Sequence, residues 1–159
     1  MQIDLDTLRT AQDLDLGESE WIPVSQERIE AFADATEDHQ WIHVEPERAA
    51  RSQFGTTIAH GYLLLSLVPK LFGQLFQMRD VEMIVNYGLD KVRFIMPVPS
   101  GDEVRLQATL LEAKPKGDGF LARIRNDLIL RSTGRRAMMA EALFLVLPSR
   151  APEVAGKAP

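Results

Sequence analysis

Residues 61–78 read GYLLLSLVPKLFGQLFQM, and this stretch decides the fold. One apolar stripe recurs at helical spacing, and further apolar side chains widen it almost all the way round. The stripe comprises Leu64, Leu67, Leu71, Leu75 and Met78, and it is widened by Leu65, Phe72 and Phe76. A helix that is apolar on most faces is usually buried. The pattern therefore predicts a long buried helix, with a kink at Pro69, around which the rest of the chain packs.

After this helix, the apolar residues recur at every second position instead of at helical spacing. Residues 104–110 alternate apolar and polar side chains, which predicts a half-buried strand after a turn over residues 99–102. Residues 116–119 and 132–134 look like hairpin tips, and they separate strands over 120–130 and 137–147. The last run is apolar on both parities, as in a strand inside a sheet. A strand pair is expected over residues 81–94.

The stretch before the buried helix is more polar. Ser25 is a plausible N-cap of a helix that breaks near Thr36, residues 37–44 indicate a structured loop, and Pro46 opens a short helix ending near Arg51. Residues 1–19 carry little pattern and suggest a loosely docked arm, and residues 149–159 suggest a flexible tail. The domain proper is expected over residues 20–148. Strands grouped after helices predict an α+β fold, in which an antiparallel sheet wraps a long helix in the hotdog arrangement.

Composition narrows the function classes. The 159 residues suit one domain, and the net charge of −5 argues against a broad nucleic-acid surface. The absence of cysteine excludes disulfides, thiolate metal sites and a cysteine nucleophile. The longest apolar run, Gly61–Pro69, is far shorter than the roughly 20 residues that span a bilayer. With no signal-peptide pattern at the N-terminus, we expect a soluble, cytoplasmic protein without nucleic-acid or membrane partners.

Two short clusters carry candidate chemistry. In the first, Asp38 and His43 lie five positions apart, and a curled loop would let both reach one water molecule. In the second, His60 and Gly61 directly precede the buried helix, whose first N–H groups could hold a developing oxyanion, worth roughly 2.7–4 kcal/mol per donor. Spacing alone favours a structural alternative, in which Asp38 caps a turn, His43 bonds a backbone carbonyl and His60 caps the helix.

Longer motifs make the sequence specific. The string FADATEDHQWIHVEPERAARSQFGTTIAHGYLL from Phe32 resembles the MaoC-like (R)-specific enoyl-CoA hydratases, whose signature is an Asp, four residues, a His, a short helix and a His-Gly pair. The stretches DKVRF from Asp90 and PVPSGD from Pro97 look like the strand and turn of that family. The stretch NYGLD from Asn86 is similar to the nodulation-protein-N-like branch. The resemblance covers roughly residues 20–148.

The resemblance implies hydration of trans-2-enoyl-CoA to (R)-3-hydroxyacyl-CoA without cofactor or metal. Carried over, Asp38 and His43 hold the catalytic water, with Asp38 as the favoured base, and the Gly61 N–H polarises the thioester carbonyl. This reverses the preference for the structural alternative. The resemblance also implies a homodimer with a continuous sheet.

The family usually has Asn and Pro where this chain has Gln40 and Trp41. Gln40 offers similar hydrogen bonds on a longer arm, and Trp41 is expected to wall the acyl pocket. His60, Gln40, Trp41 and Tyr62 are the expected substrate-binding residues. Along the helix, Tyr62, Leu65, Phe72 and Phe76 are candidates to line an acyl tunnel.

Five basic residues on the predicted strands are available as partners for the CoA phosphates, although a solvated strand face is the favoured interpretation of each. They are Lys91, Arg93, Arg123, Arg125 and Arg131. Two other functions stay open. A hotdog thioesterase would also use an activated water and a helix N-terminus, and a non-catalytic acyl-CoA-binding subunit would not depend on Asp38. Acyl chain length, the choice of CoA or carrier protein, and the pathway do not follow from the sequence.

Overall fold

The computed structural model describes residues 2–75 and 77–149 of the chain. The expected flexible tail lies outside these residues except for Ser149, as does the tunnel candidate Phe76. The elements are β1 Gln2–Ile3, α1 Leu5–Thr10, β2 Leu14–Glu18, β3 Ile22–Pro23, α2 Gln26–Thr36, α3 Trp41–Val44, α4 Pro46–Ala49, α5 Gly61–Phe72, β4 Gln77–Met78, β5 Val81–Phe94, β6 Glu103–Lys116, β7 Gly119–Leu130 and β8 Arg136–Pro148.

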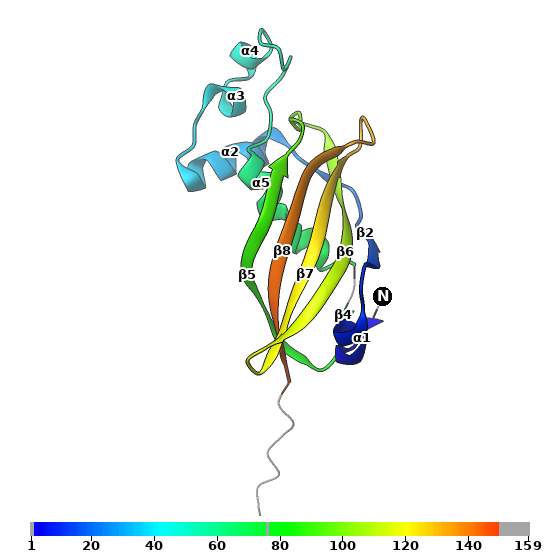
Figure 1. The fold of residues 1–159 in the computed structure, drawn as a ribbon. Coiled ribbons are helices and arrows are strands. Elements are labelled where there is room, and N and C mark those ends of the chain that lie inside the picture. Colours follow the sequence, from blue (N-terminus) through cyan, green and yellow to red (C-terminus); the bar gives the residue numbers. More distant parts are fainter. Residues whose placement is uncertain (1, 76, 150–159) are drawn as a thin grey trace, which may run out of the picture.

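A curved antiparallel sheet in the order β2-β6-β7-β8-β5 wraps around α5, and β3 pairs with β6 beside β2 (Figure 1). The three long hairpin strands β6, β7 and β8 follow each other in the chain and in the sheet. Alternate side chains of β6 are buried, as its period of two predicts. The α+β hotdog arrangement expected from the sequence is therefore confirmed. Both expected hairpin tips are also present, at residues 117–118 and 131–135.

The central helix is shorter than the apolar stretch that predicts it. Helix α5 ends at Phe72, with Gly73 as its C-cap, and Leu75 and Met78 lie beyond it. Pro69 cannot donate a backbone hydrogen bond and Gly73 has a low helix propensity, so the last turns lose support. Leu75 is nevertheless buried, because the chain stays against the core after the helix ends. None of the helices in the described residues is long and apolar enough to cross a bilayer.

The expected strand pair over residues 81–94 is wrong, because β5 is a single strand of 14 residues. The turn-forming residues around Gly88 are accommodated by irregularities in its pairing with β8, at Asn86/Gly88 and Leu89/Lys91. Such bulges insert residues into a strand without ending it. Strand β5 lies at one edge of the sheet, and β8 lies between β5 and β7, as the apolar character of β8 on both parities predicts.

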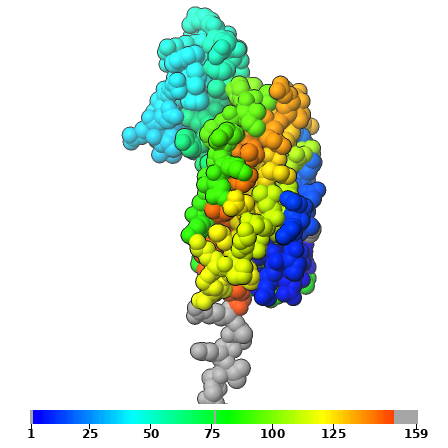
Figure 2. Space-filling model, in the orientation of Figure 1, coloured from blue at the N-terminus to red at the C-terminus, as the bar shows by residue number. Residues whose placement is uncertain are grey.

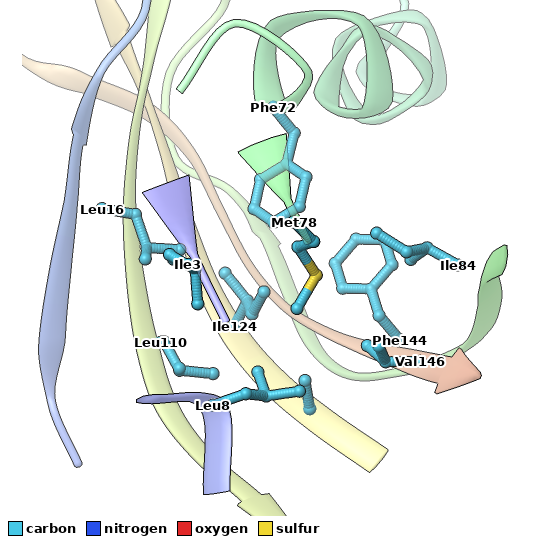
Figure 3. Close-up of a pocket in the computed structure, with 11 residues that line it drawn as sticks. Ile3, Leu8, Leu16, Phe72, Met78, Ile84, Leu110, Ile124, Phe144 and Val146 are labelled. Carbon is cyan, nitrogen blue, oxygen red and sulfur yellow. The ribbon is translucent and has the colours of Figure 1, made fainter. Parts of the chain in front are cut away.

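The expected loosely docked N-terminal arm is also wrong. Strand β2 pairs with β6, and Asp4 caps α1 by accepting a hydrogen bond from the Thr7 N–H at 2.7 Å. Ile3, Leu8 and Leu16 are at most 3% exposed. Figure 3 shows these three side chains facing Phe72 and Phe144 around a small apolar cavity of about 10 Å³. The buried apolar residues Ile3, Leu8 and Leu16 are five and eight positions apart. Their spacing matches neither the period of a helix nor that of a strand, so the sequence gives no sign of the docking.

Helices α2, α3 and α4 project past one end of the sheet, as the cyan part of Figure 1 and Figure 2 shows. We call residues 26–56 the overhang. The chain returns to the sheet through Thr57, Ile58 and Ala59, where the Ser100 N–H donates to the Thr57 carbonyl and the Ala59 N–H donates to the Val98 carbonyl, each at 2.8 Å. This return segment leads directly into α5, so the overhang and the start of the central helix meet.

Candidate active site

The two clusters singled out in the sequence meet where the overhang joins α5. One carboxylate oxygen of Asp38 and one ring nitrogen each of His43 and His60 lie within 4.8 Å of one another. Asp38 lies in the loop after α2, His43 lies on α3, and His60 is the residue before α5. Asp38 is exposed to solvent, whereas His43 and His60 are buried. The group therefore forms a wall that solvent reaches from the Asp38 side.

The ring of His43 has a defined orientation. Its Nδ1 lies 2.6 Å from the Ile58 carbonyl oxygen, which can only accept, so Nδ1 carries the proton and Nε2 is left as an acceptor. Burial lowers the pKa of His43, although the Ile58 hydrogen bond raises it, His60 lowers it further and the Asp38 charge raises it. His43 is therefore a neutral imidazole near pH 7, able to accept a hydrogen bond from water.

His60 lies beneath His43. Its ring is 2% exposed and stacks on the His43 ring, with centroids 3.7 Å apart and planes at 24°. Its Nε2 donates to the backbone carbonyl of Asp38 at 2.9 Å, which leaves Nδ1 as an acceptor. Within the described residues, this Nδ1 is buried and has no hydrogen-bond partner. The substrate-binding role expected for His60 stays a prediction, and its contacts hold the Asp38 backbone against α5.

Gly61 opens α5, where the first N–H groups of a helix have no intrahelical acceptor. A Cβ added at this position would lie 2.9 Å from two ring carbons of Phe94, closer than real Cβ atoms approach. Phe94 in turn meets Tyr62 edge to face, with ring centroids 5.8 Å apart. Glycine is thus the residue that lets an aromatic side chain, or a ligand in its place, approach the helix N-terminus closely.

Gln26 is a site residue that sequence reasoning missed. Its amide nitrogen donates to the His43 carbonyl at 2.8 Å, and its amide oxygen accepts from the Thr57 hydroxyl at 2.5 Å. It therefore ties α3 to the return segment on either side of the histidines. In the sequence Gln26 stands only in the first turn of a predicted helix, because partners 17 and 31 residues away leave no local pattern.

The other expected substrate-binding residues lie at the rim of the site. Gln40 is exposed, and its backbone carbonyl accepts from the His43 N–H at 2.9 Å. The Trp41 ring is half-buried beneath the Arg48 guanidinium, 4.6 Å from the ring centroid. Tyr62 is 70% exposed. His39 points away and pairs with Asp34 at 2.9 Å, which agrees with its interpretation as a loop histidine without a catalytic role.

A cavity of about 300 Å³ lies along α5 beyond the cluster of Asp38, His43 and His60. Leu65, Val68 and Pro69 of α5 form one side, and residues of β5, β7 and β8 form the others. Of the tunnel candidates, Leu65 lines this cavity and Phe72 lines the small apolar one beyond it, whereas Tyr62 lines neither. Trp41 is not among the residues that line either cavity, so its expected place in the acyl pocket finds no support here.

Most strand cations considered for CoA phosphates are paired with carboxylates. Lys91 lies 2.8 Å from Glu141, Arg131 lies 2.5 Å from Glu103, and Arg123 lies 2.5 Å from Asp90. Arg125 lies 3.6 Å from Asp127. Arg93 instead donates to its neighbouring Val92 carbonyl. These pairs favour the interpretation of a solvated strand face.

Two histidines and a carboxylate are also a set that can bind a divalent metal. Their candidate ligand atoms lie within 4.8 Å of one another, and the two rings are stacked with planes at 24°. The prediction that no metal or other cofactor takes part stays a prediction.

The chain belongs to the MaoC-like dehydratase family, because the family model described as MaoC like domain matches residues 9–129. The chain is 44% identical over 129 residues to 3-hydroxyacyl-thioester dehydratase Z of Mycobacterium tuberculosis, covering 80% of this chain and 85% of that protein. It is 52% identical over 109 residues to nodulation protein N of Rhizobium leguminosarum, covering 67% and 68%. These relatives confirm the resemblance drawn from the sequence.

Solved structures give the same fold. A MaoC-like dehydratase from Rhodospirillum rubrum superposes with a TM-score of 0.77 at 22% identity, covering 94% of this chain and 99% of that one. The (R)-hydratase from Aeromonas caviae superposes with a TM-score of 0.68 at 28% identity, covering 87% and 100%. The strand order of the sheet and the similarity to these solved structures both support the assignment of the hotdog fold.

Proposed function

We propose that this protein is an (R)-specific enoyl-thioester hydratase, which also runs the reverse dehydration of 3-hydroxyacyl thioesters. The observation that carries the proposal is the meeting of the Asp38 carboxylate with the His43 and His60 ring nitrogens at the N-terminus of α5. These groups are hydrogen-bond acceptors, as a bound water molecule requires. The helix terminus beside them offers the N–H donors that a thioester oxyanion requires.

In the hydration direction, the water oxygen attacks the β-carbon of the enoyl thioester while Asp38 or His43 takes one water proton. The electron pair of the double bond moves to the thioester oxygen, forming an enolate that the Gly61 N–H stabilises. The enolate collapses when the same acid–base pair returns a proton to the α-carbon. One molecule of water is added in total, and no oxidant or metal is needed.

The substrate class rests on the cavity and on the relatives. A largely apolar cavity of about 300 Å³ along α5 suits an acyl chain whose thioester lies at Gly61. One relative is named for 3-hydroxyacyl thioesters and another for (R)-specific enoyl-CoA hydration. We propose CoA as the acyl carrier, and a cytoplasmic location, where CoA thioesters are made and used, is part of the same proposal.

A homodimer is also proposed, built on the free edge of β5. This edge strand leaves large apolar side chains exposed on both faces, with Met83, Tyr87 and Leu89 each 47–49% exposed. Unpaired edges of this length invite pairing with another chain. Light scattering of the wild type should give the mass of two chains, and Leu89→Arg should give one. A wild-type monomer at all concentrations would contradict the proposal.

The proposed function is tested by following the enoyl-thioester absorbance of crotonyl-CoA and longer trans-2-enoyl-CoAs. Wild type should consume the absorbance without releasing thiol, and Asp38→Asn and His43→Ala should each lose about 10²–10⁴-fold in rate. His39→Ala is the matched control, since His39 is an exposed histidine of the same loop that pairs with Asp34. Thiol release would identify a thioesterase, and tight acyl-CoA binding without turnover would identify a binding subunit.

A further inference from the structure

Asn126 is a buried amide within an otherwise apolar part of the sheet. It lies on β7, is 0% exposed, and faces its register partners Ala108 on β6 and Ala140 on β8. Neither alanine side chain can hydrogen-bond, and both are small, which leaves space beside the amide. Asn126 lines the cavity along α5. The sheet therefore presents one buried polar group to the space proposed for the acyl chain.

The orientation of this amide is fixed by its own strand. The Asn126 NH₂ group donates to the Ile124 carbonyl at 2.9 Å. Because a carbonyl can only accept, the nitrogen faces Ile124 and the oxygen faces elsewhere. That Oδ1 is buried and has no hydrogen-bond partner in residues 2–75 and 77–149. Buried carbonyl oxygens nearly always find a donor, so a donor is missing from the protein itself.

Other polar groups around the cavity do not supply that donor. The Ser66 hydroxyl, which lines the cavity, gives its hydrogen to the Tyr62 carbonyl at 2.8 Å. Pro69 also lines the cavity and has no N–H, so the Leu65 carbonyl one turn earlier lacks its usual helical donor. Asn86 and Tyr87 of β5 also line the cavity and carry donor groups, but both are exposed and neither donates to Oδ1. The α5 side of the wall offers acceptors, and a ligand that matches Oδ1 brings a donor.

The distance between the cavity and Gly61 indicates which part of the substrate would meet Asn126. The cavity residues of α5, from Leu65 to Pro69, follow Gly61 by four to eight positions. At a rise of about 1.5 Å per residue, they lie roughly 6–12 Å along the helix from the thioester position. A group that meets Asn126 therefore belongs to the acyl chain several carbons beyond the reacting double bond.

We propose that Asn126 Oδ1 accepts a hydrogen bond from a hydroxyl group on the acyl chain, so that the protein prefers hydroxylated enoyl thioesters to plain alkyl ones. This inference rests on the proposed function, because it assigns the cavity to the acyl part of that substrate. A site that hydrogen-bonds a substrate hydroxyl discriminates strongly, because its polar group is left unpaired by the analogue that lacks the hydroxyl. Asn126 is thus a specificity-determining residue, and the reaction itself does not need it.

The test compares trans-2-octenoyl-CoA with its counterparts hydroxylated at each carbon from the fifth to the eighth. For wild type, kcat/KM for at least one hydroxylated isomer should exceed that for the plain chain. In Asn126→Leu, which is close in size, the ratio of the two should fall about tenfold, partly through faster turnover of the plain chain. An equal ratio in wild type and Asn126→Leu would overturn the proposal and leave water as the partner of Oδ1.

Two controls keep the result interpretable. Ser66→Ala removes another polar group from the same cavity and should leave the ratio unchanged; a ratio that falls in Ser66→Ala but not in Asn126→Leu would overturn the assignment to Asn126. Should Asn126→Leu fail to fold, Asn126→Ala replaces it, since its register partners are already alanines. If wild type hydrates no thioester, the proposed function fails separately, and calorimetric binding of hydroxyoctanoyl-CoA against octanoyl-CoA then decides the role of Asn126.

Discussion

His43 and His60 each donate a hydrogen bond to the chain segment that carries the other. His43, from the overhang, donates to the Ile58 carbonyl two residues before His60. His60, at the start of α5, donates to the Asp38 carbonyl five residues before His43. With the two rings stacked at 3.7 Å, this exchange locks the overhang to the central helix and sets the place of Asp38.

This exchange predicts a positioning role for His60. His60→Phe keeps an aromatic ring for stacking but loses the hydrogen bond to the Asp38 backbone, so Asp38 should shift and kcat should fall about 10²-fold. KM should change little, because His60 does not line the cavity along α5, and the free energy of unfolding should fall by about 1 kcal/mol through the lost hydrogen bond. Steady-state kinetics with a trans-2-enoyl-CoA checks this, with His39→Phe as the matched control. Full activity in His60→Phe would show that the hydrogen bond is dispensable.

The pKa values of two histidines in the overhang should be shifted in opposite directions from the ordinary value of histidine. Burial lowers the pKa of His43 below its ordinary value of 6.5, whereas the hydrogen bond that His39 donates to Asp34 raises the pKa of His39 above it. Imidazole resonances followed by NMR against pH measure both. Asp34→Asn should return His39 toward its ordinary value and leave His43 unmoved. The prediction fails if the His43 resonance titrates above pH 6.5.

The lowered pKa of His43 also links stability to pH. Well above pH 6.5 the ring is neutral in both the folded and the unfolded chain and contributes nothing to the pH dependence. As the pH falls toward and below 6.5, His43 is protonated in the unfolded chain before it is protonated in the folded chain. The free energy of unfolding therefore falls. Urea unfolding of wild type and His43→Gln between pH 7 and 5 checks this, and the variant should show the shallower slope.

Gly61 should tolerate no side chain while Phe94 is in place. Gly61→Ala sets a Cβ against the Phe94 ring, where contacts would be 2.9 Å, so the ring or the helix N-terminus must move. Displacement of the N–H donor should cost about 10²–10³-fold in kcat. The double variant Gly61→Ala/Phe94→Ala removes the clash and should recover part of that loss. Unchanged activity in the single variant would argue against an oxyanion at Gly61.

The N-terminal segment should behave as core. Leu16 is 3% exposed and packs with Ile3 and Leu8 beside β6, so Leu16→Ala should lower the free energy of unfolding by about 2–5 kcal/mol. Leu14 on the same strand is only half-buried, and Leu14→Ala should cost less. Urea denaturation of both variants makes the comparison. Equal, small losses would mean that the segment is docked loosely after all.

The sequence predicts those parts of the fold whose pattern repeats over many residues. The apolar stripe of α5 and the alternation in β6 reveal a buried helix and a half-buried strand, because burial on one face imposes a period. The N-terminal segment is missed, since its buried residues Ile3, Leu8 and Leu16 are too far apart to show a period. A strand pair is predicted over residues 81–94, whereas β5 is one strand whose pairing with β8 is interrupted by bulges around Gly88.

The candidate site is predicted to the same uneven extent. Asp38, His43 and Gly61 come from motifs whose spacing is visible in one stretch of chain, and the fold brings them together. Gln26 and Asn126 come from outside that stretch. Gln26 matters because it binds the His43 carbonyl, 17 residues away, and Asn126 matters because its Oδ1 has no partner within the described residues. Neither property leaves a pattern in the sequence.

Because the overhang projects beyond the sheet, the residues proposed for the reaction lie outside the main hydrophobic core. The sheet and α5 contain most of the buried apolar side chains, whereas Asp38 and His43 belong to short helices and loops outside it. Segments of this kind tolerate change more readily than the scaffold that carries them. Changes in residues 37–56 can therefore alter the proposed chemistry while the sheet and α5 keep the core intact, and substitutions there should cost less stability than substitutions in α5.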